Sequence, residues 1–173
     1  MNTDIILTGL MGAGKSTVGK LLADKLPEYA FFDVDEEIEK REKMTIADIF
    51  KLKSEKMFRL IETDMIAELS KKNNVVISIG GGAFENEANR KNLLNCGTVF
   101  YLKTSADILY KRIQKQGNRP LLNCADPADK LSELLKQREI NYNKAHYIID
   151  TSNKSIDDTV EEILRKIKWK KPL

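Results

Sequence analysis

The stretch "GLMGAGKST", residues 9–17, decides the fold of this chain. It fits the pattern G-x-x-x-x-G-K-[S/T], whose fixed positions are Gly9, Gly14, Lys15 and Ser16. A strand-like apolar run precedes it, and a helix-like amphipathic run follows it. Glycines let backbone N–H groups approach phosphate oxygens, and a helix N-terminus adds partial positive charge. The stretch therefore predicts a phosphate-binding loop (P-loop) between a strand and a helix.

The same stretch predicts how a nucleoside triphosphate binds. We expect Lys15 to reach the β- and γ-phosphates and the Ser16 hydroxyl to bind Mg²⁺. The loop residues expected to hold the nucleotide are Gly12, Ala13, Gly14, Lys15, Ser16 and Thr17.

The P-loop alone leaves GTPases, ATPases and kinases as candidates. The segment "NKAH", 143–146, lacks the aspartate of the guanine-reading N-K-x-D pattern, so guanine specificity is not supported. At 173 residues the chain is also small for a motor ATPase with extra domains. A small-molecule kinase is the remaining class.

Strand and helix patterns alternate along the chain, which predicts an α/β fold with a parallel sheet covered on both faces. The length favours a single domain over 1–173. Within it, 35–62 has helical pieces but no strand, so we interpret it as a substrate-binding insertion; 114–127 resembles a mobile loop. The strand candidates are 4–8, 30–35, 75–79, 98–102 and 146–150; the helix candidates are 15–26, 35–43, 54–72, 86–95, 105–116, 128–144 and 156–168.

Composition excludes several functional classes. Hydrophobic residues make up 42% of the chain and charged residues 32%, with a net charge of +3, which suits anionic small molecules without requiring nucleic acid. The sequence contains no apolar run long enough to predict a membrane span, and its first residues lack the pattern of a signal peptide. We therefore expect a cytoplasmic protein. Cys96 and Cys124 are expected to be free thiols. With His146 as the only histidine, Ser-His-Asp hydrolysis and multi-histidine metal chemistry are improbable.

Two acids lie where a second strand is predicted to end. Asp33 and Asp35 stand in "FFDVDEEIE", 31–39, and side chains two residues apart on a strand face the same side. They would point into the crevice at the carboxyl ends of the strands, one to orient Mg²⁺ and the other to orient or deprotonate a substrate hydroxyl. An acidic first turn of a helix is the alternative interpretation of Asp35.

Three arginines are candidates for gripping an anion, because guanidinium groups bind carboxylate and phosphate in a planar, bidentate way. Arg59 lies three residues from Glu62, off an expected apolar stripe that starts at Met57. Arg119 lies in the predicted mobile loop, and Arg138 in a predicted helix. Taken singly, an arginine is more often a solvated surface residue, and the alternative interpretation of Arg59 with Glu62 is a surface ion pair.

Taken together, the motifs of this sequence resemble those of the shikimate kinase family. The resemblance extends through "FFDVDEEIE", "TIADIF", "EKMFRLIE", "SIGGGAF", "NRPLL" and "KQREINY", and covers nearly the whole chain. It implies a nucleoside monophosphate kinase-like fold with a five-stranded parallel sheet, a substrate subdomain and a closing lid. It also implies phosphorylation of the 3-hydroxyl of shikimate with ATP and Mg²⁺. We expect the protein to be a monomer without nucleic-acid or membrane partners.

The resemblance assigns roles to individual residues. Asp33 assists Mg²⁺ through water, Asp35 contacts the substrate hydroxyls as the candidate base, and Glu62 supports the site from behind. The acceptor site is implied to comprise Asp35, Arg59, Gly80, Gly81, Gly82 and Arg138. Arg119 would meet the transferring phosphoryl group, and Arg112 would pack against adenine.

One departure and two alternatives remain open. The family often has a proline near 153–157 beside adenine, where this chain has Ser155 and Ile156. A kinase of another polyol acid, such as gluconate, is an alternative, although it need not have paired arginines beside a GGGA turn. A non-catalytic nucleotide-dependent regulator is the second, against which Lys15, Asp35 and Arg119 argue. The basic tail at 165–172 is interpreted as a solvated helix end rather than a nucleic-acid or membrane patch.

Overall fold

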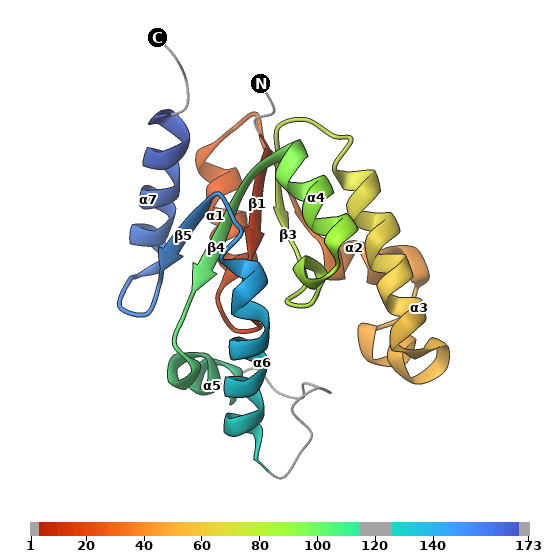
Figure 1. Ribbon diagram of the computed structural model, residues 1–173. Coiled ribbons are helices and arrows are strands. Elements are labelled where there is room, and N and C mark those ends of the chain that lie inside the picture. The colour runs from red at the N-terminus through yellow and green to blue at the C-terminus, as the bar shows by residue number, and fades with distance from the viewer. Residues whose placement is uncertain (1–3, 115–125, 170–173) are drawn as a thin grey trace.

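The computed structural model describes residues 4–114 and 126–169. Five parallel strands form one sheet in the order β2-β3-β1-β4-β5, and helices cover both of its faces (Figure 1). The predicted α/β fold with a five-stranded parallel sheet is therefore confirmed. The strands are β1 (Asp4–Thr8), β2 (Ala30–Asp33), β3 (Val75–Ser78), β4 (Gly97–Lys103) and β5 (Tyr147–Asp150).

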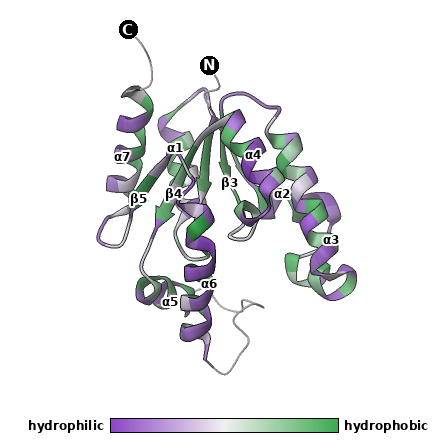
Figure 2. Ribbon diagram, in the orientation of Figure 1, coloured by the Kyte–Doolittle hydropathy of each residue, from purple (hydrophilic) through white to green (hydrophobic). Residues whose placement is uncertain are grey.

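The central strand, β1, shows why this sequence forms a parallel sheet. All five of its residues are buried, as expected for a strand with neighbours on both sides and helices on both faces. Ile5 is opposite Val76 on β3 and Thr98 on β4. The hydrophobic colour of Figure 2 is concentrated on these strands, whereas the helices are hydrophobic on one side only. Such burial anchors the carboxyl ends of the strands, where the P-loop begins.

The helices connect successive strands and pack on the sheet. α1 packs on β3 and against α7 on one side, and α4 packs on β4 and against α3 on the other. No helix in the described part of the chain has the length and apolar character needed to cross a membrane. The helical elements are α1 (Lys15–Lys25), α2 (Val34–Glu42), α3 (Ile46–Leu69), η1 (Ala83–Glu85, a 3₁₀ turn), α4 (Glu87–Cys96), α5 (Ala106–Gln114), α6 (Pro127–Tyr142) and α7 (Ile156–Trp169).

The strand predicted over 30–35 ends earlier, at Asp33. There the Asp33 carboxylate accepts a hydrogen bond from the backbone N–H of Asp35 at 3.0 Å, which makes Asp33 the N-cap of α2. Strand alternation was therefore the wrong reason for expecting the two acids on one side, although both of them line one cavity in front of the P-loop. Asp35 lies in the acidic first turn of α2, as the alternative interpretation had it.

α3 combines the predicted helix 54–72 with the helical segment before it. Ser54 interrupts it with a φ of 81° and a ψ of 159°. The expected apolar stripe holds at Met65 and Leu69, which are buried, but not at its first position. Met57 is 45% exposed, whereas the neighbouring Phe58 is buried, with its ring centroid 4.8 Å from that of Phe50. Glu62 lies on the buried side, so the idea of a surface ion pair with Arg59 was wrong.

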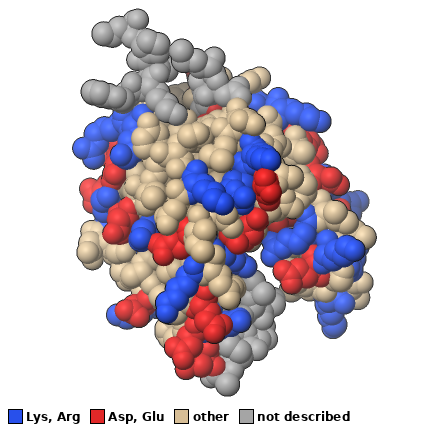
Figure 3. Space-filling view, in the orientation of Figure 1, with Lys and Arg blue, Asp and Glu red and all other residues tan. Residues whose placement is uncertain are grey.

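The histidine and the described cysteine, for which the sequence predicted no catalytic role, contribute to the fold. His146 accepts a hydrogen bond from the backbone N–H of Val99 through Nδ1, at 3.0 Å. Cys96 is a buried free thiol, whereas Cys124 lies outside the described residues. Basic and acidic side chains are interspersed on the face seen in Figure 3.

Candidate active site

The P-loop adopts the backbone conformation that its glycines permit. Gly12 and Gly14 have φ angles of 80° and 89°, in the left-handed region that favours glycine. Gly14 is the N-cap of α1 and has no side chain to offer the first N–H groups of the helix, which leaves them available to an anion. Lys15 Nζ donates to the carbonyl oxygens of Gly9 at 2.9 Å and Leu10 at 3.1 Å. The lysine ammonium is thereby held over the loop.

A pair of oxygen ligands lies at the start of α1. The Ser16 hydroxyl donates to Asp33 Oδ2 at 2.6 Å, while Asp33 Oδ1 caps α2. A hydroxyl and a carboxylate are the ligand types that Mg²⁺ prefers, so the donor chemistry fits this ion. The sequence-predicted metal residues, Ser16 and Asp33, are thus neighbours although 17 positions apart in the chain.

A cavity, here called the loop cavity, opens in front of the P-loop. Its lining includes Gly12, Gly14, Lys15, Ser16 and Thr17 from the predicted nucleotide-binding set. Ala13 does not line it, because this residue is buried and its N–H donates to Leu10 O within the loop. The remaining lining residues are Met11, Asp33, Asp35, Ser78, Ile79, Gly80 and Gly81.

A second cavity, here called the arginine cavity, adjoins the first. Its charged lining consists of residues predicted for acceptor binding or support, from α2, α3 and α6: Asp35, Arg59, Glu62 and Arg138. The backbone of Gly80, Gly81 and Gly82 completes this polar part. The other wall is apolar and was not identified from the sequence: Met11, Ile46, Phe50 and Phe58.

Arg59 is fixed between two carboxylates. Its Nη1 lies 2.8 Å from Glu62 Oε2, and its Nη2 lies 3.2 Å from Glu55 Oε1. Burial acts to lower the pKa of Arg59, but both carboxylates together raise it, so the guanidinium stays charged. The guanidinium also lies 5.1 Å from the Phe58 ring centroid.

Glu62 is a buried carboxylate, only 1% exposed. Burial raises its pKa, the ion pair with Arg59 opposes this rise, the negative charge of Asp35 adds to it, and Arg138 lowers it slightly. Oε1 of Glu62 has no hydrogen-bond partner within residues 4–114 and 126–169. The Glu62 carboxylate therefore holds Arg59 in place from the buried wall of the arginine cavity.

The three glycines differ in how tightly the side chains of the cavity surround them. A Cβ atom at Gly80 would be 2.7 Å from Glu62 Oε1, and one at Gly82 would be 2.8 Å from Arg59 Nη2. A Cβ atom at Gly81 would find nothing closer than Arg138 Nη1, at 3.4 Å. A side chain at 80 or 82 would therefore force a charged group of the cavity to move, whereas one at 81 would not.

The two cavities share part of their walls. Met11, Asp35, Gly80 and Gly81 line both. Asp35 is thus placed between the Lys15 side and the side that holds the two arginines. A group bound over the P-loop and a small molecule bound between the arginines would meet at this carboxylate.

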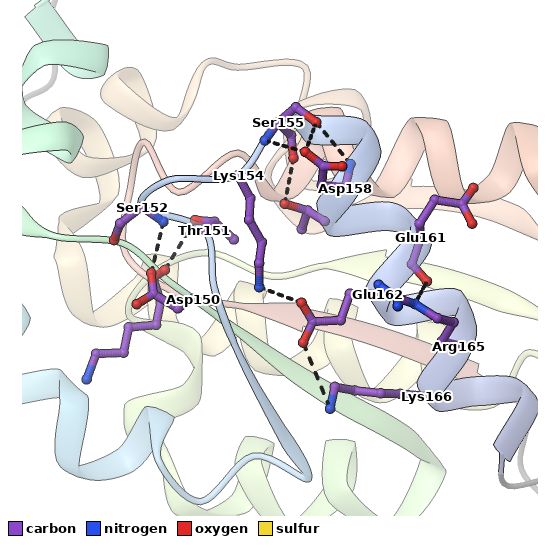
Figure 4. A network of polar contacts seen from close by, with 12 residues as sticks. Asp150, Thr151, Ser152, Lys154, Ser155, Asp158, Glu161, Glu162, Arg165 and Lys166 are labelled. Atoms are coloured by element: carbon purple, nitrogen blue, oxygen red, sulfur yellow. Dashed lines mark hydrogen bonds and ion pairs between the residues drawn. The ribbon is translucent and has the colours of Figure 1, made fainter.

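Two residues expected near adenine, Arg112 and Ile156, lie next to the P-loop. Arg112 Nη1 donates to Gly12 O at 3.3 Å, and Ile156 Cδ1 would be 3.7 Å from a Cβ atom at Gly14. Ser155, where the family often has proline, is part of a cap for α7. Its Oγ donates to Asp158 Oδ2 at 2.6 Å and accepts from the Asp158 N–H at 3.0 Å (Figure 4).

Two basic residues of the C-terminal tail, Arg165 and Lys166, make contacts within α7. Arg165 Nε donates to Glu161 O at 3.4 Å, and Lys166 lies 3.9 Å from Glu162 (Figure 4). Lys154 pairs with the same glutamate.

The structure brings most predicted site residues together and leaves their roles as predictions. Arg119 and most of the predicted lid lie outside the described residues. Besides the apolar wall, the sequence interpretation missed Tyr142, whose hydroxyl donates to Gly81 O. Its position four residues after Arg138 was the available signal, because residues i and i+4 share a helix face.

Comparisons with known proteins agree with this geometry. A family model described as "Shikimate kinase" matches residues 11–168. A shikimate kinase of Nitrosospira multiformis is 42% identical over 153 residues, which cover 88% of this chain and 78% of that protein. The structure of a shikimate kinase from Acinetobacter baumannii in complex with shikimate superposes with a TM-score of 0.93 at 40% identity, covering 99% of this chain and 96% of that one.

The same architecture occurs in kinases of other small molecules. A gluconokinase from Sinorhizobium meliloti has a TM-score of 0.61 at 18% identity, covering 97% of this chain and 93% of that one. This likeness shows the shared fold alone.

Proposed function

The chain belongs to the shikimate kinase family, and on that premise we propose that it transfers the γ-phosphoryl group of ATP to the 3-hydroxyl of shikimate. The products are shikimate 3-phosphate and ADP. The enzyme is a Mg²⁺-dependent phosphotransferase with an alcohol acceptor, and it serves the chorismate route to aromatic amino acids.

The observation that carries this proposal is the common wall of the two cavities. A phosphate site and a small-molecule site meet at Asp35, Met11, Gly80 and Gly81. Phosphoryl transfer needs the attacking hydroxyl and the γ-phosphate in line, and little covalent help beyond that. A shared wall supports such an arrangement because both substrates would be held by the segments that follow β1, β2 and β3.

The lining of the arginine cavity supports shikimate as the acceptor. Arg59 and Arg138 supply two guanidinium groups for one carboxylate, and Asp35 supplies an acceptor for hydroxyl hydrogens. The apolar wall suits the carbon ring. Shikimate combines these three features: a carboxylate, three hydroxyls and a ring. A site with hydrogen-bonding groups of this kind discriminates strongly against analogues that lack the matching groups.

On the nucleotide side, Gly12, Gly14 and Thr17 hold the phosphates. Lys15 exchanges its hydrogen bonds to the loop carbonyl oxygens for an ion pair with the phosphates. Ala13 belongs to this loop as part of its backbone. Arg112 and Ile156 flank the adenine ring.

Ser16 and Asp33 would hold Mg²⁺, Asp33 through water, because a hydroxyl and a carboxylate are oxygen ligands that suit this ion. The ion, when bound, neutralises charge on the transferring phosphate.

Asp35 orients the 3-hydroxyl and takes its proton as the oxygen attacks phosphorus. Arg119, carried by the lid at about 114–127, stabilises the transferring group, a role in which an arginine contributes about 10³–10⁵ in rate in other enzymes. Closure of this segment over the site excludes water, which would otherwise compete for the phosphoryl group.

The proposal extends to organisation and location. The enzyme acts as a monomer in the cytoplasm, with its acceptor-binding insertion at 35–62 inside a single P-loop kinase domain, and it binds neither nucleic acid nor membrane.

A coupled ADP-release assay tests the function. The purified protein, with ATP and Mg²⁺, is offered shikimate, gluconate and nucleoside monophosphates in parallel. We expect turnover with shikimate alone. Turnover of gluconate without turnover of shikimate would replace the assignment by the gluconokinase alternative. Nucleotide binding without turnover of any acceptor would favour a non-catalytic regulator.

A further inference from the structure

Tyr142 connects the glycine turn to α6 from behind the arginine cavity. It is the last residue of α6 and fully buried, and it does not line the cavity. Its hydroxyl donates a hydrogen bond to the carbonyl oxygen of Gly81. Nearby, Asn141 Nδ2 donates to Glu85 Oε2 at 3.1 Å, which ties α6 to the same region a second time.

The Tyr142 hydroxyl also faces Arg138. The two residues are one helical turn apart and so share a face of α6. Burial raises the pKa of Tyr142 strongly, while the charge of Arg138 and a side-chain hydrogen bond from it act in the opposite direction. The hydroxyl therefore keeps its proton at neutral pH. It can donate to Gly81 and accept from the guanidinium at once.

The two arginines of the cavity are held in different ways. Arg59 has ion pairs to Glu55 and Glu62. Arg138 has no ion pair within the described ranges, and Tyr142 is its hydrogen-bonding neighbour there. Arg138 Nη1 would also contact a Cβ atom at Gly81 at 3.4 Å, so guanidinium, turn and hydroxyl form one cluster.

We propose that Tyr142 is a positioning residue for acceptor recognition, whose hydroxyl sets the orientation of Arg138 relative to the Gly81 backbone. The inference rests on the proposed function, in which Arg138 grips the carboxylate of shikimate. A guanidinium with many rotamers loses less entropy on binding when it is already oriented. The energy of this hydroxyl would then be expressed in acceptor affinity, with little effect on nucleotide affinity.

Tyr142→Phe removes the hydroxyl and keeps the ring. The neighbouring Tyr101 provides a matched control, because its ring centroid lies 4.9 Å from that of Tyr142 and it is equally buried. The Tyr101 hydroxyl has no hydrogen-bond partner in the described part of the chain. Tyr101→Phe is thus the same deletion at a neighbouring, equally buried ring, without the link to Gly81 and Arg138.

The assay measures KM for shikimate, KM for ATP and Tm for the wild type and both variants. For Tyr142→Phe we expect shikimate KM to rise about tenfold, the change produced by about 1.4 kcal/mol, while ATP KM changes less than about twofold. For Tyr101→Phe we expect neither KM to change. In an Arg138→Ala background, Tyr142→Phe should add little to the weakening of shikimate binding, because coupled residues are non-additive.

Each outcome decides one question. Wild-type turnover of shikimate with an unchanged shikimate KM in Tyr142→Phe would overturn this inference and leave the proposed function standing. Equal increases in both KM values, or an unreduced effect of Tyr142→Phe in the Arg138→Ala background, would show a general structural role and also overturn it. Absence of wild-type turnover with shikimate would overturn the proposed function, and the inference with it.

Discussion

The guanidinium of Arg59 lies directly against the backbone of Gly82. A Cβ atom added at Gly82 would be 2.8 Å from Nη2 and 2.9 Å from Nη1, well inside van der Waals contact. Arg59 cannot easily withdraw, because Glu62 and Glu55 hold the same two nitrogens. The position of this arginine therefore depends on the absence of a side chain in the turn after β3.

Gly82→Ala is expected to displace Arg59 and weaken acceptor binding. Hydrogen bonds to charged groups contribute about 1.5–3 kcal/mol, so shikimate KM should rise about tenfold or more, with a much smaller change in ATP KM. Gly81→Ala is the matched comparison, since its Cβ atom would meet only ordinary contacts of 3.4–3.5 Å. Steady-state kinetics on both variants would contradict this explanation if Gly81→Ala were the more damaging.

Arg59→Ala and Arg138→Ala are both expected to weaken shikimate binding strongly and to leave ATP binding nearly intact. They should differ in stability. Removing Arg59 leaves the buried Glu62 carboxylate without its ion pair, at a cost on the order of 3 kcal/mol. Arg138 has no such ion pair within the described residues, so its loss should cost less.

Calorimetry of shikimate and ATP binding, together with denaturant unfolding, measures both effects. Equal losses of affinity for the two substrates would argue against a carboxylate clamp. Equal stabilities of the two variants would show that Glu62 does not depend on Arg59.

Local motifs, together with the family resemblance that they carry, were sufficient to predict the sheet, the P-loop and the polar residues of the arginine cavity. The strand patterns were readable because β1 and β3 are buried throughout. Where the prediction failed, a side chain made a contact that sequence alone does not reveal. Asp33 ended its strand by capping α2, and Phe58 took the buried position on α3 that had been expected for Met57.

Tyr142 was missed for a similar reason. A tyrosine at the end of an amphipathic helix is typical of core packing, and nothing in its own sequence neighbourhood points to Gly81, 61 positions away. Only the fold brings the turn after β3 against the end of α6. The positions of such partners depend on tertiary contacts between elements and not on local pattern.

Asp35→Asn is expected to lower kcat by about 10²–10⁴ while the fold is retained. Asn keeps the shape of the side chain but cannot accept the proton of the 3-hydroxyl. Asp35 is also one of several acids in the first turn of α2, so its loss should change stability little. Single-turnover kinetics and Tm measurements test this together. A variant with wild-type kcat would rule out a base at this position and leave Asp35 an orienting residue.

The pH dependence of stability should show the buried state of Glu62. Its pKa in the folded protein is raised above 4.5, chiefly by burial, so between 4.5 and the folded pKa the folded protein binds more protons than the unfolded chain. The free energy of unfolding therefore falls as pH rises through that window. Glu62→Gln removes the titration, so the stability of the wild type relative to this variant should fall with rising pH.

Glu87 provides a control of opposite sign. It is an exposed residue whose pKa is lowered by its hydrogen bond to Lys91, at 2.9 Å. The stability of the wild type relative to Glu87→Gln should therefore rise as pH increases towards 4.5. Urea unfolding at a series of pH values measures both differences. If the Glu62 difference also rose with pH, its pairing with Arg59 would outweigh burial, and the carboxylate would be held charged throughout.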